Sequence, residues 1–328
     1  MIRIAIDAMG SDNGSKAVCG AVKNFLKDYK DVAFVVCGKE EELQSLKEFG
    51  DRIEFVYTDE VMGMEDGALE IMRRKNTSMM KAIEQVALKN CEGVVSAGST
   101  GAFLTGATIK LKLIPGVERA ALVSPFPTED GKGVTLLDIG ANNENRPEHL
   151  LTFAKMGQVF TEKVRGINEP KVFLLSNGAE EKKGSPVVKL AHQLLKEDKF
   201  VNFNGNIEAR YVLTGVADVV VCEGYPGNVF LKGTEGTASM MNNLIKKAFK
   251  KNIFTMIGYL FAKSGFKEMK STMDYKKYGG AILLGVNGIA VKGHGSSDEY
   301  SFYHAIRVAY EAINKECIRH MKEAMVNE

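Results

Sequence analysis

An amide side chain with catalytic potential follows a strongly apolar run late in the chain. Residues 219–222 read Val-Val-Val-Cys, and Glu-Gly-Tyr-Pro-Gly then precedes Asn228. This pattern predicts a strand buried on both faces, a glycine-containing turn and a helix that opens at Asn228. In α/β proteins such a junction is a place where ligands bind. Asn228 stands at this junction with a side-chain amide that can donate hydrogen bonds to a ligand.

Five further turns combine glycine with small hydroxyl, amide or carboxylate side chains. They occupy residues 7–12, 96–101, 140–142, 176–178 and 292–298. Backbone N–H groups at such turns can bind anions, and turns that follow parallel strands lie on one edge of the sheet. For any single turn, a steric role of glycine is the simpler interpretation. Taken together, the five predict a phosphate or carboxylate pocket. The candidate contacts are Gly10, Ser11, Asp12, Gly98, Ser99, Thr100, Gly101, Asn142, His294 and Ser296.

Several common chemistries lack their sequence motifs. The chain has no G-x-G-x-x-G sequence, no Walker A loop and no G-x-S-x-G elbow. Its five histidines show no metal-ligand spacing, so we predict neither a metal ion nor an organic cofactor. The five cysteines form no C-x-x-C pair, which indicates reduced, buried thiols in a cytoplasmic protein.

The overall composition excludes two further classes of function. The 43 basic and 41 acidic side chains nearly balance, which argues against binding of nucleic acid through charge alone. No stretch approaches the roughly 20 apolar residues that a membrane-spanning helix requires. With 45% hydrophobic residues among 328, the chain can bury a large core.

Apolar, β-branched runs alternate with helical patterns along the whole chain. We predict strands at 2–6, 32–37, 53–57, 93–95, 121–123, 134–139, 172–175, 219–222 and 282–286. Helical spacing appears at 79–88, 147–164 and 187–196, and Asn145 with Pro147 and Glu148 predicts the start of the second helix. This alternation predicts a single three-layer α/β/α, Rossmann-like domain over residues 1–328, with a mostly parallel sheet.

Residues 240–273 interrupt this alternation with an apolar centre at 253–262 that lysines flank on both sides. We predict a turn at Ser264-Gly265. An apolar tip framed by lysines can lie in the interface of an anionic membrane. The alternative is a buried dimer helix with a solvated basic face. The predicted membrane contacts are Phe254, Ile257, Leu260 and Phe261.

Five long motifs resemble one known family, and they occur in order. They are IAIDAMGSD at 4–12, SAGSTGA at 96–102, LLDIGANNENRPEHLLTFAKMG at 136–157, GVADVVVCEGYPGNVFLKGTEG at 215–236 and DYKKYGGAILLGVNGIAVKGHGSSD at 274–298. They look like those of the bacterial phosphate acyltransferases of phospholipid synthesis, and the resemblance runs from residue 2 to about 308. Small exchanges at Ser11, Ser99 and Ser176-Asn177 depart from the family pattern and affect individual contacts.

The resemblance implies a homodimer with a fold similar to the isocitrate and isopropylmalate dehydrogenases. It implies transfer of a long acyl group from acyl-acyl carrier protein to inorganic phosphate, without metal or nucleotide. It further implies a protruding helical hairpin at about residues 240–273, through which the protein attaches peripherally to the cytoplasmic face of an anionic membrane. It also implies hand-over of acyl phosphate to a membrane glycerol-3-phosphate acyltransferase. The hairpin lysines are also suited to contact the acidic carrier protein.

Two catalytic residues follow from the family motifs. The family's lysine precedes the glycine of its EExKG segment and matches Lys183, and its asparagine in the GNV motif matches Asn228. A lysine suits phosphate and an amide suits an acyl oxyanion, so we expect Lys183 to position phosphate and Asn228 to donate to the thioester oxygen. By itself the run Glu180–Lys183 indicates a solvated surface turn, and the adjacent Lys182 is the alternative match.

Two other functions remain open on sequence alone. A decarboxylating dehydrogenase on the same fold requires a nicotinamide site and metal-binding aspartates, and no convincing aspartate cluster is evident. A non-catalytic scaffold at the membrane surface requires neither Lys183 nor Asn228, whereas both stand in intact motifs.

Overall fold

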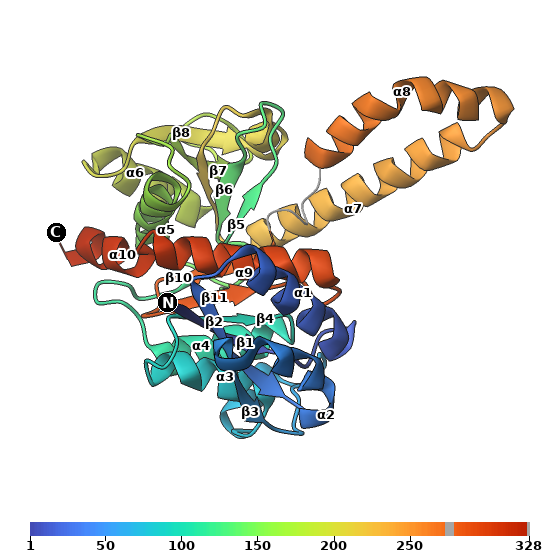
Figure 1. Ribbon diagram of the computed structural model, residues 1–328. Helices are drawn as coiled ribbons and strands as arrows, with labels where there is room; N and C mark the ends of the chain where they lie inside the picture. Colours follow the sequence, from blue (N-terminus) through green and yellow to red (C-terminus); the bar gives the residue numbers. More distant parts are fainter. Residues whose placement is uncertain (273–278, 327–328) are drawn as a thin grey trace.

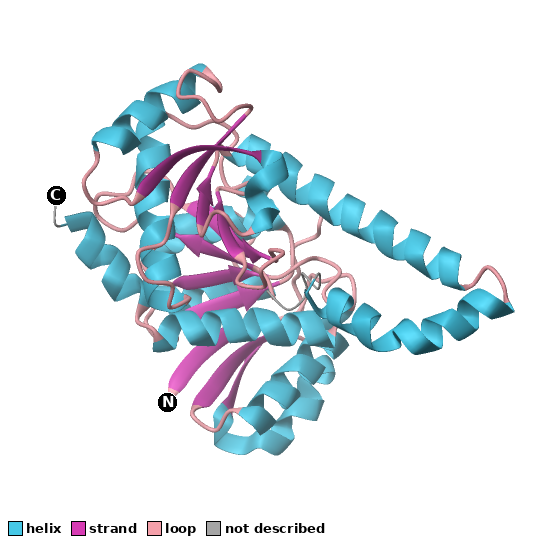
Figure 2. Cartoon of the chain, turned by 90° about the horizontal axis from the view of Figure 1, so that it is seen from above, coloured by secondary structure: helices cyan, strands magenta, loops and turns pink. Residues whose placement is uncertain are grey.

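A computed structural model describes residues 1–272 and 279–326. An eleven-stranded sheet crosses the body, in the order β3-β2-β1-β4-β11-β10-β5-β6-β9-β7-β8, with helices on both sides (Figures 1 and 2). The strands are β1 (Ile2–Asp7), β2 (Val32–Gly38), β3 (Ile53–Tyr57), β4 (Gly93–Ser96), β5 (Ala121–Phe126), β6 (Val134–Leu137), β7 (Val172–Ser176), β8 (Phe203–Glu208), β9 (Val219–Val221), β10 (Ala281–Leu284) and β11 (Ile289–Lys292).

The described helices follow the strands as crossover connections and caps. The α-helices are α1 (Gly14–Asp28), α2 (Glu40–Leu43), α3 (Ser78–Ala87), α4 (Thr100–Leu111), α5 (Pro147–Val159), α6 (Pro186–Glu197), α7 (Gly224–Phe249), α8 (Ile253–Thr272), α9 (Glu299–Asn314) and α10 (Cys317–Val326). Shorter helical turns are η1 (Gln44–Arg52), η2 (Ala68–Met72), η3 (Phe160–Val164) and η4 (Ala209–Thr214).

The alternation of side chains along the strands divides the core into two layers. Ile4 of β1 packs in one buried cluster with Phe25 of α1 and Phe302 of α9. The next residue, Ala5, faces the opposite side and belongs to a second cluster that contains Phe103 of α4. Successive residues of a strand point to opposite faces, so a strand covered by helices on both sides is apolar throughout. The predicted three-layer α/β/α architecture is confirmed.

The two halves of the sheet run in opposite directions, because β10 is antiparallel to both β11 and β5, and β5 is antiparallel to β6. The register nevertheless places the carboxyl ends of β6 and β11 in one row. Leu137 pairs with Val123, Val123 with Ile282, and Ile282 with Val291. The expectation of a single common edge is therefore wrong, and turns from the two halves instead meet near the centre of the sheet.

Helices α7 and α8 form an antiparallel hairpin that projects from the body (Figure 1). The rings of Phe249, Tyr259 and Phe266 hold the two helices together, with centroids 4.7 to 6.0 Å apart. The predicted hairpin is confirmed, but it begins at Gly224 rather than near residue 240. Its turn lies at residues 250–252, so the predicted turn at Ser264-Gly265 is wrong and lies within α8. Residues 273–278, which include the start of the DYKKYGG motif, lie outside the described residues.

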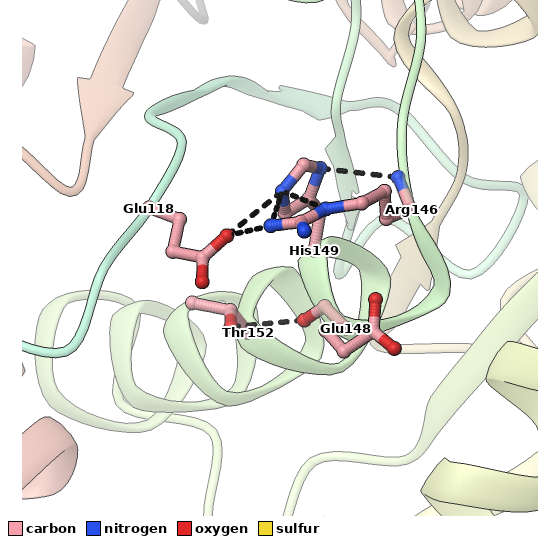
Figure 3. A network of polar contacts seen from close by, with 5 residues as sticks. All are labelled: Glu118, Arg146, Glu148, His149 and Thr152. Carbon is pink, nitrogen blue, oxygen red and sulfur yellow. Dashed lines mark hydrogen bonds and ion pairs between the residues drawn. The ribbon is translucent and has the colours of Figure 1, made fainter.

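The start of α5 differs from the prediction by one residue. Arg146, not Asn145, is the N-cap, because Pro147 occupies the first helical position and favours extended backbone in the residue before it. The Arg146 N–H donates to Nδ1 of His149 at 3.1 Å, and the Arg146 guanidinium pairs with Glu118 (Figure 3). Asn145 instead accepts a hydrogen bond from the N–H of Gly224 at 3.0 Å.

Two strands have no counterpart in the predicted set. Strand β8 contains Gly205 and two asparagines, residues that are depleted in strands, and its position at the sheet edge tolerates them. Strand β11 is only four residues long and follows β10 through a tight turn that Gly285, with a φ of +95°, begins.

Candidate functional site

A cavity of about 930 Å³ lies between the centre of the sheet and the base of the hairpin. Its lining comes from β5 and the turn after it, residues 139–140, one face of α7, and residues 292–297 after β11. Gly265 and Met269 of α8 and residues 279–281 complete the wall. Its volume lies in the range of small-molecule binding sites.

One wall of the cavity is apolar. It is formed by Leu122, Pro125, Phe126, Pro127, Ile139, Leu213, Leu231, Ala238 and Met269. Phe126 is buried and its ring lies 6.0 Å from that of Phe230 on α7, which fixes the helix against β5. A continuous apolar wall of this extent favours a ligand with a hydrocarbon portion.

A buried lysine also lines the cavity. Lys292 ends β11, is 6% exposed, and its ammonium donates a hydrogen bond to the carbonyl of Gly293. Burial lowers the pKa of Lys292 to about 8; the carboxylates of Asp7 and Asp12 oppose this shift, and the Lys232 ammonium adds to it. The lysine is therefore a desolvated cation that faces a second cation on α7.

Asp7 occupies the carboxyl end of β1 and is fully buried. Its carboxylate accepts hydrogen bonds from the hydroxyls of Ser78 at 2.6 Å and Ser96 at 2.7 Å. Burial raises the pKa of Asp7 to about 6, although these hydrogen bonds and the charge of Lys292 oppose the rise. Asp7 thus supplies the negative charge that partly compensates the buried ammonium.

Backbone hydrogen bonds join three of the five predicted turns. The Gly293 N–H donates to the carbonyl of Ser96 at 2.8 Å, and the Asp12 N–H donates to the carbonyl of Gly295 at 2.9 Å. Gly10 approaches Gly98 so closely that a Cβ on Gly10 would lie 3.4 Å from the Gly98 Cα. The turns after β1, β4 and β11 therefore lie together, whereas the prediction that all five turns share one edge is wrong.

Thr100, His294 and Ser296 line the cavity among the predicted contacts from these turns. The Nδ1 atom of His294 lies 2.8 Å from the hydroxyl of Ser296, and burial lowers the pKa of His294. The hydroxyl of Ser297 is buried beside them and has no hydrogen-bond partner within the described part of the chain.

The other contacts predicted from the first two turns stabilise the turns themselves and do not line the cavity. The hydroxyl of Ser11 donates to the carbonyl of Gly14. Ser99 is the N-cap of α4, and a Cβ on Gly101 would lie 3.1 Å from the Cβ of Ala68. These residues shape the turns around the cavity.

Asn228 lines the cavity from the second turn of α7. The helix begins at Gly224, four residues earlier than predicted, because the Gly-Tyr-Pro-Gly segment at 224–227 is itself helical. Asn228 is exposed and lies against Gly140, where an added Cβ would come within 3.4 Å of the Asn228 side chain. Its side chain therefore lies at the cavity beside the turn that follows β6.

The turn after β6 determines where α7 begins. A Cβ on Gly227 would lie 1.9 Å from the carbonyl oxygen of Asp138, and one on Gly224 would lie 2.0 Å from that of Asn142. Only glycine permits this approach. The Asn142 amide donates to Asp138 and to the carbonyl of Ala120, both at 2.8 Å, so Asn142 holds the turn and is not a cavity contact.

Lys183 lies in the exposed turn between β7 and α6 and is not among the described residues that line the cavity. Two residues later, the hydroxyl of Ser185 donates to the carboxylate of Glu223 at 3.0 Å. Glu223 is the N-cap of α7, so the turn that carries Lys183 is anchored to the helix that carries Asn228. The hydroxyl of Ser176, next to Gly184, is buried without a partner in the described residues.

Sequence reasoning did not identify Lys232, Lys292 and Ser297 as residues of the cavity. Lys292 and Ser297 fall within the predicted turn at 292–298 but are not among its candidate contacts, and Lys232 lies one helical turn beyond Asn228. The signal that could have identified them is spacing. Residues 228 and 232 share one face of a helix, and Lys292 directly follows an apolar run.

Comparison with known proteins identifies the family. A model of a family described as fatty acid synthesis protein matches residues 2–320. Phosphate acyltransferases from two strains of Staphylococcus aureus, MRSA252 and bovine RF122, are each 41% identical over 326 residues, 99% of this chain and 98% of theirs. The chain belongs to the phosphate acyltransferase family. The predicted recognition is confirmed, and the chain is an enzyme of this acyltransferase family.

More distant solved structures share the fold. A branched-chain phosphotransacylase from Enterococcus faecalis covers 95% of this chain and all of its own, with a TM-score of 0.60 and 17% identity. A protein from Salmonella typhimurium described as a putative 4-hydroxythreonine-4-phosphate dehydrogenase covers 95% of this chain and 99% of its own, with a TM-score of 0.54 and 12% identity. At these identities the likeness establishes the fold alone.

Proposed function

We propose that this phosphate acyltransferase family member transfers a long-chain acyl group from acyl-acyl carrier protein to inorganic phosphate. An oxygen of HPO₄²⁻ attacks the thioester carbon, the C–O bond forms and the C–S bond breaks. The proton of the phosphate ends on the departing sulfur, so the products are acyl phosphate and the free thiol. The observation that carries this proposal is the cavity, whose lining combines many apolar residues with Asn228, Lys232 and Lys292.

Asn228 stabilises the oxyanion in this proposal. Attack on the thioester places negative charge on the former carbonyl oxygen, and a preorganised N–H donor lowers the energy of that charge. The residue is held on the rigid second turn of α7, and the contact with Gly140 limits its freedom. The acyl chain then lies along the apolar residues of the lining, with its thioester beside Asn228.

Lys183 positions phosphate from the turn that faces the start of α7. The hydrogen bond between Ser185 and Glu223 supports this role because it holds the turn beside the helix. The unpartnered hydroxyl of Ser176 and the amide nitrogen of Asn145 provide further polar groups at these strand ends, within the described residues. No nucleophilic side chain is needed, since phosphate near neutral pH is itself the nucleophile.

The hairpin attaches the enzyme to an anionic membrane surface. Phe254 is 81% exposed, Leu260 67% and Phe261 87%, and Ile257 lies in the same segment of α8. Within the described residues, none of the helices has the length and apolar character needed to cross a bilayer. Large exposed apolar side chains flanked by lysines suit binding in the lipid interface. A lipid product is then released where a membrane glycerol-3-phosphate acyltransferase can receive it.

We further propose a homodimer, which sedimentation velocity tests directly.

The experiment that tests the activity is a trapping assay. The purified protein is incubated with palmitoyl-acyl carrier protein, with and without phosphate, and hydroxylamine is added to trap acyl phosphate as hydroxamate. Phosphate-dependent loss of the acyl group with formation of hydroxamate supports the proposal. If a carrier protein that is competent with another enzyme gives no turnover, the proposal fails and a scaffold function at the membrane takes its place.

A further inference from the structure

A buried lysine that lines the cavity makes fewer hydrogen bonds within the described residues than an ammonium can donate. Lys292 is 6% exposed, and within the described part of the chain its ammonium donates one hydrogen bond, to the adjacent carbonyl of Gly293. An ammonium can donate three hydrogen bonds, and burying it without full pairing is costly. A position that keeps such a lysine next to a cavity is suited to an anionic ligand.

A second observation points to the same place. Ser297 is 2% exposed, lines the cavity, and its hydroxyl has no partner within the described residues. A Cβ on Gly293 would lie 3.4 Å from this hydroxyl, so Ser297 and the carbonyl that Lys292 contacts lie beside the same glycine. Buried hydroxyls are almost always hydrogen-bonded in native proteins, and the open side of this one is the cavity.

The third group is the ammonium of Lys232, which belongs to α7. Lys232 of α7 lines the cavity and forms an ion pair with Glu235 at 2.9 Å. It also repels the Lys292 ammonium electrostatically. Two cations across a cavity disfavour each other, and an anion between them removes that repulsion.

We propose that Lys292, Ser297 and Lys232 form the subsite that binds the phosphate group, at the polar end of the cavity that accommodates the acyl chain. The proposal rests on the function proposed above and deepens it, because it assigns phosphate-binding groups in addition to Lys183. Lys292 and Ser297 bind phosphate oxygens from the end of β11, and Lys232 closes the site from α7. Asn228, one turn before Lys232, then lies next to the bound phosphate, where the attacked thioester must be.

The loop geometry supports a preorganised site. The turn at 293–297 is tied to β4 through Gly293 and Ser96, and to the N-terminal turn through Asp12 and Gly295. Gly280 packs over Lys292 so closely that a Cβ there would lie 2.6 Å from the Lys292 carbonyl oxygen. The backbone around Lys292 is therefore fixed on both sides before any ligand binds.

Steady-state kinetics of the full chain with a detergent-solubilised acyl donor test the subsite. The variants are Lys292→Met, which keeps the length of the side chain without its charge, and Ser297→Ala. We expect Lys292→Met to raise KM for phosphate by about 10- to 100-fold, the usual effect of removing one charge-assisted hydrogen bond. We expect KM for the acyl donor to stay within about twofold of the parent value. Lys110→Met is the matched control, because Lys110 pairs with Glu84 away from the cavity.

The donor also carries a phosphodiester, in the pantetheine arm of the carrier protein. If Lys292→Met raises KM for the acyl donor and leaves KM for phosphate unchanged, the subsite binds that phosphodiester and the proposal for inorganic phosphate is overturned. The proposal is also overturned if KM for phosphate rises in Lys183→Ala alone.

A binding measurement on the resting protein separates this inference from the proposed activity. Inorganic phosphate, titrated without any acyl donor, raises Tm of the parent protein, and Lys292→Met and Ser297→Ala lose part or all of that rise. If phosphate raises Tm in a way that depends on Lys292 but the protein transfers no acyl group, the phosphate subsite is supported and the proposed activity is rejected. Equal protection in the parent and in both variants overturns the subsite, whatever the turnover.

Discussion

The cavity and the tip of the hairpin depart from ordinary protein solvation in opposite ways. In the cavity, the charged Lys292 is buried, at 6% exposure. At the tip, Phe254 and Phe261 are more than 80% exposed. A buried cation and exposed phenyl rings each lower the stability of the isolated chain, and each is compensated when the matching ligand binds. The contrast indicates that one region is suited to an anion and the other to an apolar surface.

The largest effect tests whether the cavity performs the chemistry. Asn228→Ala removes the proposed oxyanion donor and should lower kcat by roughly 10²- to 10³-fold, as for other oxyanion-hole deletions. Vesicle binding should be unchanged. Asn243→Ala, on the same helix but far along the hairpin, is the control. Near-full turnover by Asn228→Ala would remove Asn228 from the mechanism.

The next effect tests whether the hairpin acts separately from the cavity. Leu260→Glu should weaken binding to anionic vesicles by roughly 10- to 100-fold, because one leucine contributes about 1.5–3 kcal/mol when it leaves water. Turnover with detergent-solubilised substrate should stay at the parent level. Leu88→Glu changes an equally exposed leucine outside the hairpin and should leave sedimentation with vesicles unaffected. Unaltered sedimentation of Leu260→Glu would count against the anchor.

A third comparison concerns Lys183 and its neighbour Lys182, the alternative match to the family's lysine. Lys183→Ala should reduce kcat/KM for phosphate by roughly 10- to 100-fold, since a charge-assisted contact is lost. Lys182→Ala, at the neighbouring exposed position, should change it less than about twofold. A larger loss in Lys182→Ala than in Lys183→Ala would transfer the role to Lys182.

The smallest effect concerns the stability of the cavity itself. The pKa of Lys292 is about 8 in the folded protein, below the ordinary value of 10.5, so the unfolded chain binds the proton more tightly. The charge of Lys292 therefore destabilises the fold fully below pH 8, and the penalty disappears as the pH rises toward 10.5. Lys292→Met should be more stable than the parent at pH 7 without phosphate, with the difference closing over this range. Chemical denaturation at pH 7 and at about pH 9 to 10 measures it, and a parent that is more stable at pH 7 contradicts the assignment.

Residue patterns alone specify the family, the layered α/β/α fold and most of the strands. Continuous apolar runs such as Val219–Val221 are buried on both faces, and a few consecutive residues are enough to predict such a strand. The apolar segment of the hairpin is evident for the same reason. Its turn is not, because Ser264 and Gly265 are compatible with a helix that packs through Phe249 and Phe266.

Which turns share a site depends instead on contacts between distant parts of the chain. The sequence cannot reveal that three consecutive antiparallel pairs, β11–β10, β10–β5 and β5–β6, leave the two halves of the sheet running in opposite directions, because strand direction depends on pairing between residues far apart in the chain. That reversal brings Asn228 and Lys292 to one cavity from opposite-running strands, and leaves Asn142 as a support of its own turn. Burial of Lys292 likewise depends on neighbours from β1, β4 and α7, so its altered pKa and its proposed role follow from the fold rather than from the local sequence.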